Sequence, residues 1–216
     1  MKFLVVGGVA GGASTATRLR RLDESAEIIM FEKGPHVSFS NCCLPYRLSE
    51  TVGETDALVM MSPAQFKNQY NIEARVEHEV LSIDRAAKTV RVKNLSTGEE
   101  YTEAYDKLIL SPGANAFVPQ LPGMENANIF VVKNVVDIAK LYEFVHSGNV
   151  KKVTVVGGGF IGVETAENLV EAGYEVSLVE AMPQILRIFD YDMVQILHVI
   201  VGAGITAVIQ SSSATT

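Results

Sequence analysis

A run of glycines from Gly157 to Gly162, reading Gly-Gly-Gly-Phe-Ile-Gly, constrains the fold of this chain more than any other feature. The apolar stretch Val153–Val156 precedes it and favours a strand, whereas Val163–Ala172 has the pattern of a helix. Glu180 ends the next strand, 18 residues after the last glycine. Such glycines let a pyrophosphate approach a helix N-terminus, and an acid at this distance can bind a ribose. The sequence therefore predicts a dinucleotide-binding unit, and its acid favours NADH over NADPH because it repels a 2′-phosphate.

The chain begins with a less complete pattern of the same kind. Lys2–Val6 is strand-like, Gly7–Gly12 reads Gly-Gly-Val-Ala-Gly-Gly, Ala13–Leu22 is helical, and Glu32 lies 20 residues after the last glycine. Val9 replaces the middle glycine of the fingerprint, so the pattern also fits an ordinary turn between a strand and a helix. Two dinucleotide folds suggest two dinucleotides, and a hydride donor with a flavin is the usual pair.

The segment between the two patterns alternates between helical and strand-like stretches. We expect one helix over Ser62–Tyr70 and a second, capped by Asn134, over Val135–Val145. We expect strands over Ile72–Val76, Glu79–Ile83 and Thr89–Lys93, and a buried strand over Tyr105–Leu110. The predicted fold class is α/β, with two Rossmann-like dinucleotide-binding units of the three-layer ββα/βαβ type. We expect domains over residues 1–123 and 124–198, followed by an atypical apolar tail over 199–216.

Charge and composition exclude several classes of protein. The 216 residues carry a formal net charge of −7 and the pI is near 5.2, which argues against nucleic acid or an anionic membrane as the main partner. The apolar start, Met1–Val6, is too short for a signal peptide and is better explained as a first strand. Two cysteines without the spacing of a metal site or a disulfide framework indicate no metal and a reducing, cytoplasmic compartment.

Both cysteines lie in one stretch, Ser38–Tyr46, which reads Ser-Phe-Ser-Asn-Cys-Cys-Leu-Pro-Tyr and is typical of a tight turn. Adjacent cysteines are either structural or reactive, and the stretch alone leaves both interpretations open. Arg47 stands where a C-x4-C redox pair would place its second thiol, and Cys43 is a poor partner because a disulfide between neighbours is strained. If Cys42 is redox-active, its partner sulfur or oxygen comes from the substrate, as a mixed disulfide or a sulfenic acid.

Four stretches together carry a resemblance to a known family: Gly7–Gly12, Ser38–Tyr46, Leu108–Ala114 and Gly157–Glu164. They resemble the flavin-dependent pyridine nucleotide-disulfide oxidoreductases, in particular the single-cysteine branch of coenzyme A-disulfide reductases, NADH oxidases and polysulfide reductases. The resemblance implies FAD and NADH as cofactors and Cys42 as the catalytic residue. Relative to that family the chain looks C-terminally truncated and lacks a dimerisation domain, so a homodimer is expected of a full-length protein.

The resemblance also implies the residues that bind cofactors and substrate. The cofactor-binding set is Gly7, Val9, Ala10, Gly11, Gly12, Glu32, Lys33, Pro112, Gly113, Ala114, Gly157, Gly159, Phe160, Ile161, Gly162, Glu164 and Glu180. The set for coenzyme A is Ser14, Arg18, Arg21, Ser38 and Asn41.

The residues themselves support only part of these assignments. Ser14, Arg18 and Arg21 share one helix face and could meet phosphates. A solvated helix surface explains them equally well, because Arg20 and Arg21 are followed by acidic residues. Solvation of a helix surface is an equal alternative for Glu164.

The tail from Val199 to Thr216 contains no charged residue. Its end resembles the Gln-Ser-Ser-Ser motif of sodium/phosphate cotransporters, which would suggest a foreign segment joined near residue 199. Alternatively, the tail supplies the third strand of the second unit, with Gly202 and Gly204 in a turn. Its apolar part is too short to span a bilayer, and no membrane is expected for residues 1–198.

These observations favour an FAD-dependent enzyme that passes a hydride from NADH through the flavin to Cys42, which reduces coenzyme A disulfide or a related disulfide or persulfide. One alternative is an NADH oxidase or peroxidase that uses a sulfenic acid on Cys42. Another is an inactive dinucleotide-binding fragment. A membrane transporter segment would rest on the tail alone.

Overall fold

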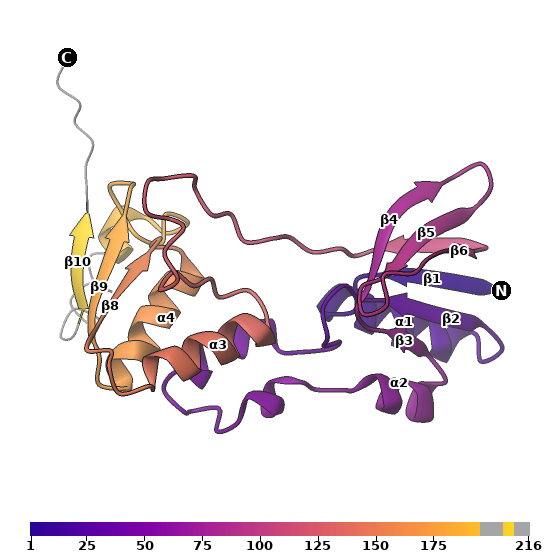
Figure 1. Cartoon of the computed structure of the whole chain (residues 1–216), viewed down its shortest axis with the longest axis horizontal. Coiled ribbons are helices and arrows are strands. Elements are labelled where there is room, and N and C mark those ends of the chain that lie inside the picture. The colour runs from indigo at the N-terminus through magenta and orange to yellow at the C-terminus, as the bar shows by residue number, and fades with distance from the viewer. Residues whose placement is uncertain (195–204, 210–216) are drawn as a thin grey trace, which may run out of the picture. The chain divides into compact units, whose positions relative to one another are not determined.

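The computed structural model describes residues 1–194 and 205–209, and the chain divides into two compact units (Figure 1). Unit 1 consists of Met1–Asn41 and Leu58–Phe117, and unit 2 consists of Cys42–Ala57 and Val118–Thr216. The division falls between Asn41 and Cys42, so the cysteine pair belongs to unit 2.

Unit 1 is built on a parallel sheet with the strand order β3-β2-β1-β7. Its strands are β1 (Lys2–Val6), β2 (Glu27–Phe31), β3 (Glu73–Arg75) and β7 (Lys107–Leu110). Two helices lie on one face, α1 (Ala10–Leu22) and α2 (Pro63–Tyr70). An antiparallel sheet of the order β4-β5-β6 lies on the other face (Figure 1), with β4 (His78–Asp84), β5 (Thr89–Asn94) and β6 (Glu100–Ala104).

The alternation of side chains along the central strands explains the three layers of unit 1. Val5 and Met30 point toward the helices and pack in one cluster with Ala16. Leu4 and Phe31, their neighbours along the chain, pack in a second cluster against the antiparallel sheet. Successive residues of a strand face opposite sides, so a sheet covered on both faces is apolar throughout.

Unit 2 repeats the strand-loop-helix pattern on a parallel sheet of the order β10-β9-β8. The strands are β8 (Lys152–Val156), β9 (Glu175–Glu180) and β10 (Ile205–Ile209). Its helices are α3 (Val135–Val145) and α4 (Phe160–Glu171). Three short 3₁₀ helices lie between β2 and α2 in the chain: η1 (Asn41–Cys43), η2 (Pro45–Arg47) and η3 (Thr55–Leu58).

Several elements differ from the sequence-based expectation. Helices α1 and α4 begin at Ala10 and Phe160, three residues earlier than expected, because the last glycines of each loop form part of the first helical turn. Strand β6 was not expected. The strand expected to be buried, Tyr105–Leu110, is shorter and only partly covered: Leu110 is 57% exposed, because β7 is the end strand of its sheet.

Part of the tail forms β10, which pairs in parallel with β9 from Ile205 beside Val176 to Ile209 beside Glu180. This agrees with the interpretation of the tail as a third strand of the second unit. The glycines expected to form the turn before it and the Gln-Ser-Ser-Ser motif lie outside the described residues. None of the described helices is long and apolar enough to cross a membrane.

Candidate functional site

The two glycine loops have the same backbone geometry. Gly7 and Gly157 follow β1 and β8 and have positive φ angles of +96° and +107°, which side chains rarely tolerate. Gly7 donates its N–H to Phe31 O and Gly157 donates to Val179 O, each at 2.8 Å, which ties each loop to the neighbouring strand. The less complete fingerprint in unit 1 therefore forms the same loop as the complete one in unit 2.

The last glycine of each loop permits a close approach of helix and strand. A Cβ on Gly12 would lie 1.7 Å from Gly7 O, and a Cβ on Gly162 would lie 1.8 Å from Gly157 O. Gly159 is different, because its φ is −78° and a Cβ there would meet nothing within 4 Å. Close packing within the protein thus explains why positions 12 and 162 require glycine, whereas the space beside Gly159 is open to a ligand.

The helices that follow the two loops lack the capping side chains found on the other helices. Ser62 caps α2 and Asn134 caps α3, each accepting a hydrogen bond from a backbone N–H of the first turn. At α1 and α4, which begin after Val9 and Gly159, no side chain among the described residues makes such a bond. Uncapped N–H groups and the positive end of the helix dipole suit a phosphate, so the structure fits a pyrophosphate at both positions.

Each loop is also held by the acid that ends the second strand of its unit. Glu32 Oε2 accepts from Gly8 N at 2.8 Å and Oε1 accepts from Gly34 N at 2.9 Å. Glu180 Oε2 accepts from Gly158 N at 2.6 Å and Oε1 accepts from Met182 N at 2.8 Å. The two acids therefore make equivalent contacts, and each holds its carboxylate at the glycine loop.

Hydrogen bonding lowers the pKa of Glu180. Partial burial of the carboxyl acts to raise its pKa, but the N–H groups of Gly158, Met182 and Ala181 outweigh this effect and hold the pKa below its usual value. A carboxylate that is ionised at neutral pH can accept hydrogen bonds from ribose hydroxyls and repels a 2′-phosphate.

Sequence reasoning missed the second glycine of each loop. A Cβ on Gly8 would lie 2.7 Å from Val37 Cγ1, and a Cβ on Gly158 would lie 2.6 Å from Ile185 Cγ2. Their carbonyls accept from Ser38 N and Leu186 N at 2.8 and 2.7 Å. The sequence feature that marks these residues is the pair of adjacent glycines at the start of each loop, because the standard fingerprint requires only the first of them.

The remaining residues of the predicted cofactor set lie around the two loops or along the chain after them. Phe160 and Ile161 open α4 with 52% and 57% of their surface exposed, and Glu164 lies one turn further, half-buried. Pro112, Gly113 and Ala114 are exposed in the segment that follows β7. Lys33 is exposed and pairs with Glu79 at 2.8 Å.

The predicted coenzyme A contacts on α1, Ser14, Arg18 and Arg21, are all exposed. Arg20 is not part of this surface, contrary to the charge-pattern interpretation. It is buried, and its guanidinium donates to Tyr70 O, Asn71 O, Asp23 O and Glu24 O at 2.7–3.3 Å. Ser38 is half-buried, with φ +48°, and Asn41 is exposed at the start of η1.

Cys42 lies in η1, exposed, and Cys43 beside it is partly buried. Their sulfur atoms lie 4.0 Å apart, about twice the length of a disulfide bond. Of the residues that follow, Leu44, Pro45 and Leu48 are buried, so the turn is packed against the protein while the Cys42 thiol remains accessible.

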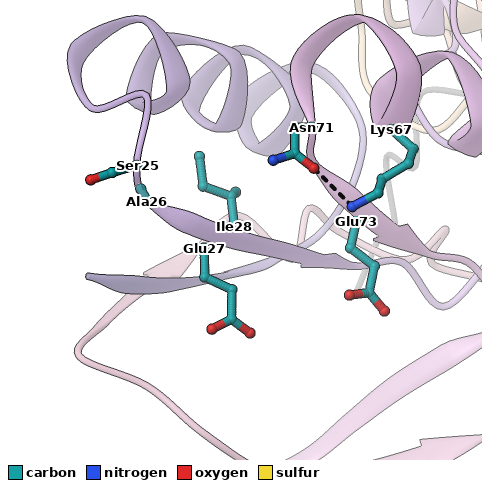
Figure 2. Close-up of a pocket in the computed structure, with 7 residues that line it drawn as sticks. All are labelled: Ser25, Ala26, Glu27, Ile28, Lys67, Asn71 and Glu73. Carbon is teal, nitrogen blue, oxygen red and sulfur yellow. Dashed lines mark hydrogen bonds between the residues drawn. The ribbon is translucent and has the colours of Figure 1, made fainter.

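A surface cavity of about 270 Å³ lies elsewhere in unit 1 (Figure 2). Residues from β2, β3 and α2 line it, with Lys67 donating to Asn71 across its rim at 2.8 Å. None of the predicted site residues is among those lining it: Ser25, Ala26, Glu27, Ile28, Lys67, Asn71 and Glu73.

Comparison with known proteins places the chain in a family. The family model described as pyridine nucleotide-disulphide oxidoreductase matches residues 1–206. A coenzyme A disulfide reductase of Staphylococcus aureus is 40% identical over 194 residues, which cover 90% of this chain and 44% of the relative. The chain thus spans less than half the length of this curated relative.

Two solved structures have closely similar folds. The reduced CoADR-RHD of Bacillus anthracis is 44% identical, with a TM-score of 0.93 over 96% of this chain and 38% of that one. An NAD-dependent persulfide reductase from A. fulgidus is 32% identical, with a TM-score of 0.92 over 97% of this chain and 39% of that one. These likenesses confirm the predicted resemblance and the α/β class with Rossmann-like units. The chain belongs to the pyridine nucleotide-disulphide oxidoreductase family.

Proposed function

We propose that this chain carries the FAD- and NADH-binding parts of an oxidoreductase that reduces coenzyme A disulfide or a related disulfide or persulfide through Cys42. Family membership and the two equivalent loops support the class of reaction. The single observation that carries the assignment of the nucleophile is that Cys42 is exposed and its sulfur lies too far from that of Cys43 for a disulfide bond.

The flavin is assigned to the loop of unit 1 and NADH to the loop of unit 2. In unit 1, Gly7–Gly12 and the uncapped start of α1 would hold the pyrophosphate, and Glu32 the ribose. In unit 2, the equivalent groups are Gly157–Gly162 and Glu180, whose ionised carboxylate favours NADH. When bound, the flavin would relay the electron pair of NADH to sulfur.

Cys42 would act as a nucleophile toward the substrate disulfide. Its thiolate attacks one sulfur, the sulfur-sulfur bond of the substrate breaks, and one thiolate leaves. The result is a mixed disulfide on Cys42, and two electrons with one proton then restore the Cys42 thiolate and release the second thiol. NADH supplies those electrons. Ser38 and Asn41 precede the nucleophile in the chain, and we assign them, with Ser14, Arg18 and Arg21, to coenzyme A binding.

The test replaces each cysteine separately in the flavin-loaded protein. We expect Cys42→Ser to retain flavin reduction by NADH, measured as bleaching of the flavin absorbance without oxygen, and to lose disulfide turnover. Cys43→Ser is the matched control and should retain both. Full disulfide turnover in the Cys42→Ser variant would refute the assignment. Oxygen or peroxide consumption without thiol release would instead indicate an NADH oxidase or peroxidase.

A further inference from the structure

Arg47, five residues after Cys42, is a buried cation with only 5% of its surface exposed. Its guanidinium carbon lies 3.4 Å from the centroid of the Tyr142 ring on α3. Its Nε donates to Thr55 Oγ1 at 3.2 Å and its Nη1 donates to Val52 O at 3.4 Å. A buried charge is costly unless it is paired, and here an aromatic face and two oxygens from the same segment satisfy it.

Tyr142 is itself held in place on its helix. Its hydroxyl donates to Glu50 Oε1, and the His146 ring stacks on its ring at a centroid distance of 4.0 Å. The hydrogen bond to Glu50 raises the pKa of Tyr142 above its ordinary value. Arg47 and Glu50, both in the segment that follows the cysteines, therefore contact the same side chain of α3.

A second contact joins the same segment to α4. Ser49 Oγ donates to Asn168 Oδ1 at 2.6 Å, and Asn168 is 2% exposed. The amide nitrogen of Asn168 donates to Glu164 O at 2.8 Å, which fixes the orientation of the amide on the helix. Because α4 follows the glycine loop of unit 2, residues 42–50 are bound to the helix that begins at the NADH loop.

The turn that carries Cys42 has little stability of its own. It consists of two 3₁₀ helices, η1 and η2, of three residues each, and such short pieces depend on packing for their conformation. Attack of a thiolate on a disulfide requires aligned atoms, and a misplacement of about 1 Å can cost about 100-fold in rate. The contacts of Arg47 therefore matter for the chemistry of a side chain that they do not touch.

We propose that Arg47 is a positioning residue, which stacks on Tyr142 to hold the turn of residues 42–48 on α3 and thereby fixes where the Cys42 thiol is presented. This inference rests on the proposed function. In a two-thiol enzyme of C-x4-C spacing the second redox sulfur would stand at position 47. In this chain the same position carries Arg47, which orients the nucleophile Cys42.

The first measurement does not depend on the flavin. Hydrogen-deuterium exchange of the peptide that covers residues 42–48 is compared in the wild type and in Arg47→Met, Arg47→Lys, Tyr142→Ala and Tyr142→Phe. We expect the exchange rate of this peptide to increase at least fivefold in Arg47→Met, Arg47→Lys and Tyr142→Ala. The Arg47→Met/Tyr142→Ala double variant should exchange no faster than either single variant. Tyr142→Phe keeps the aromatic face and should stay within twofold of wild type. Unchanged exchange in Arg47→Met would overturn the proposal.

The second measurement separates positioning from a general structural role. In the flavin-loaded protein, Arg47→Met should lower kcat for the disulfide at least tenfold, with KM and flavin reduction by NADH within about twofold of wild type. Arg47→Lys keeps the charge but loses the planar group and should not restore kcat, whereas Tyr142→Phe should remain within about threefold of wild type. The control is Arg91→Met, an exposed arginine of unit 1 paired with Glu100 at 3.9 Å, which should change nothing.

The outcomes are distinguishable. An equal loss of flavin reduction and of disulfide turnover in Arg47→Met, or full activity of Arg47→Lys, would contradict positioning by the stacked guanidinium. If the wild type binds flavin and accepts electrons from NADH but reduces no disulfide, the proposed function fails, and the exchange experiment still decides whether Arg47 holds the turn.

Discussion

Replacing Gly159 by alanine is expected to weaken NADH binding without destabilising the fold. In the structure Gly159 has φ −78° and ψ −177°, a conformation that alanine adopts freely, and a Cβ there meets nothing within 4 Å. Alanine is a poorer N-cap than glycine, which costs at most about 1 kcal/mol, and the smaller entropy of the unfolded chain offsets about 0.4–1 kcal/mol. The free energy of unfolding should therefore change by less than about 1 kcal/mol.

The expected loss of affinity follows from the hydrogen bonds that a methyl group would displace. A hydrogen bond to a charged group contributes about 1.5–3 kcal/mol, and each 1.4 kcal/mol is about tenfold in affinity. If the methyl group keeps the pyrophosphate from one N–H at the start of α4, the Kd for NADH should rise about 10- to 150-fold. The measurement is a fluorescence titration of NADH, alongside denaturant unfolding followed by circular dichroism.

Gly162→Ala is the matched comparison, because it has the opposite expectation for stability. Its Cβ would lie 1.8 Å from Gly157 O, so α4 must move away from the strand by more than 1 Å. Overpacking of this kind costs about 1–3 kcal/mol. If Gly159→Ala lowers the free energy of unfolding as much as Gly162→Ala does, or binds NADH like the wild type, the reasoning about the open space beside Gly159 is wrong.

Further predictions concern charged groups that form hydrogen bonds within each unit. Arg20→Met should lower the free energy of unfolding by about 2–4 kcal/mol, because four backbone carbonyls lose their donor, whereas Arg18→Met on the exposed face should change it by less than about 0.5 kcal/mol; thermal unfolding measures both. Glu180 has a lowered pKa in the folded state, so its contribution to stability is complete above the unfolded value near 4.5 and is lost as the pH falls through the folded pKa. Below pH 4.5 the stability of the wild type should therefore fall more steeply than that of Glu180→Gln, and parallel curves would contradict this. Glu103 accepts hydrogen bonds from Lys2 and Arg75, and its pKa is lowered although its burial acts to raise it. Below the unfolded pKa the stability of the wild type should therefore also fall more steeply than that of Glu103→Gln.

The conformation of both glycine loops could be predicted from the sequence because the order strand, glycines, helix and acid is set by local backbone geometry. Even the valine at position 9 did not alter the loop, since the glycines at which a Cβ would lie within 3 Å of another atom, Gly7, Gly8 and Gly12, are all present. The starts of α1 and α4 were placed too late because glycine disfavours helices, whereas here the close approach of helix and strand requires glycine within the first turn.

Other features depend on contacts between residues far apart in the chain and could not be predicted. Strand β6 has little strand preference in its sequence, Glu-Tyr-Thr-Glu-Ala, and forms because it pairs with β5. Arg20 looks solvated among charged neighbours, but its partners Tyr70 and Asn71 lie 50 and 51 residues away. The sequence shows of Arg47 only that it stands where a C-x4-C pair would place its second thiol. Its partner Tyr142 lies on a helix much later in the chain.

In the proposed reaction, electrons from NADH reach a single sulfur, and the chemical state of Cys42 reports whether they do. The flavin-loaded protein is mixed without oxygen with coenzyme A disulfide, and the mass of the peptide containing Cys42 is measured before and after NADH is added. We expect one coenzyme A attached to Cys42, with one thiol released, and its complete removal by NADH with release of the second thiol. Attachment at Cys43, no attachment, or an adduct that persists after the flavin has been reduced would contradict it.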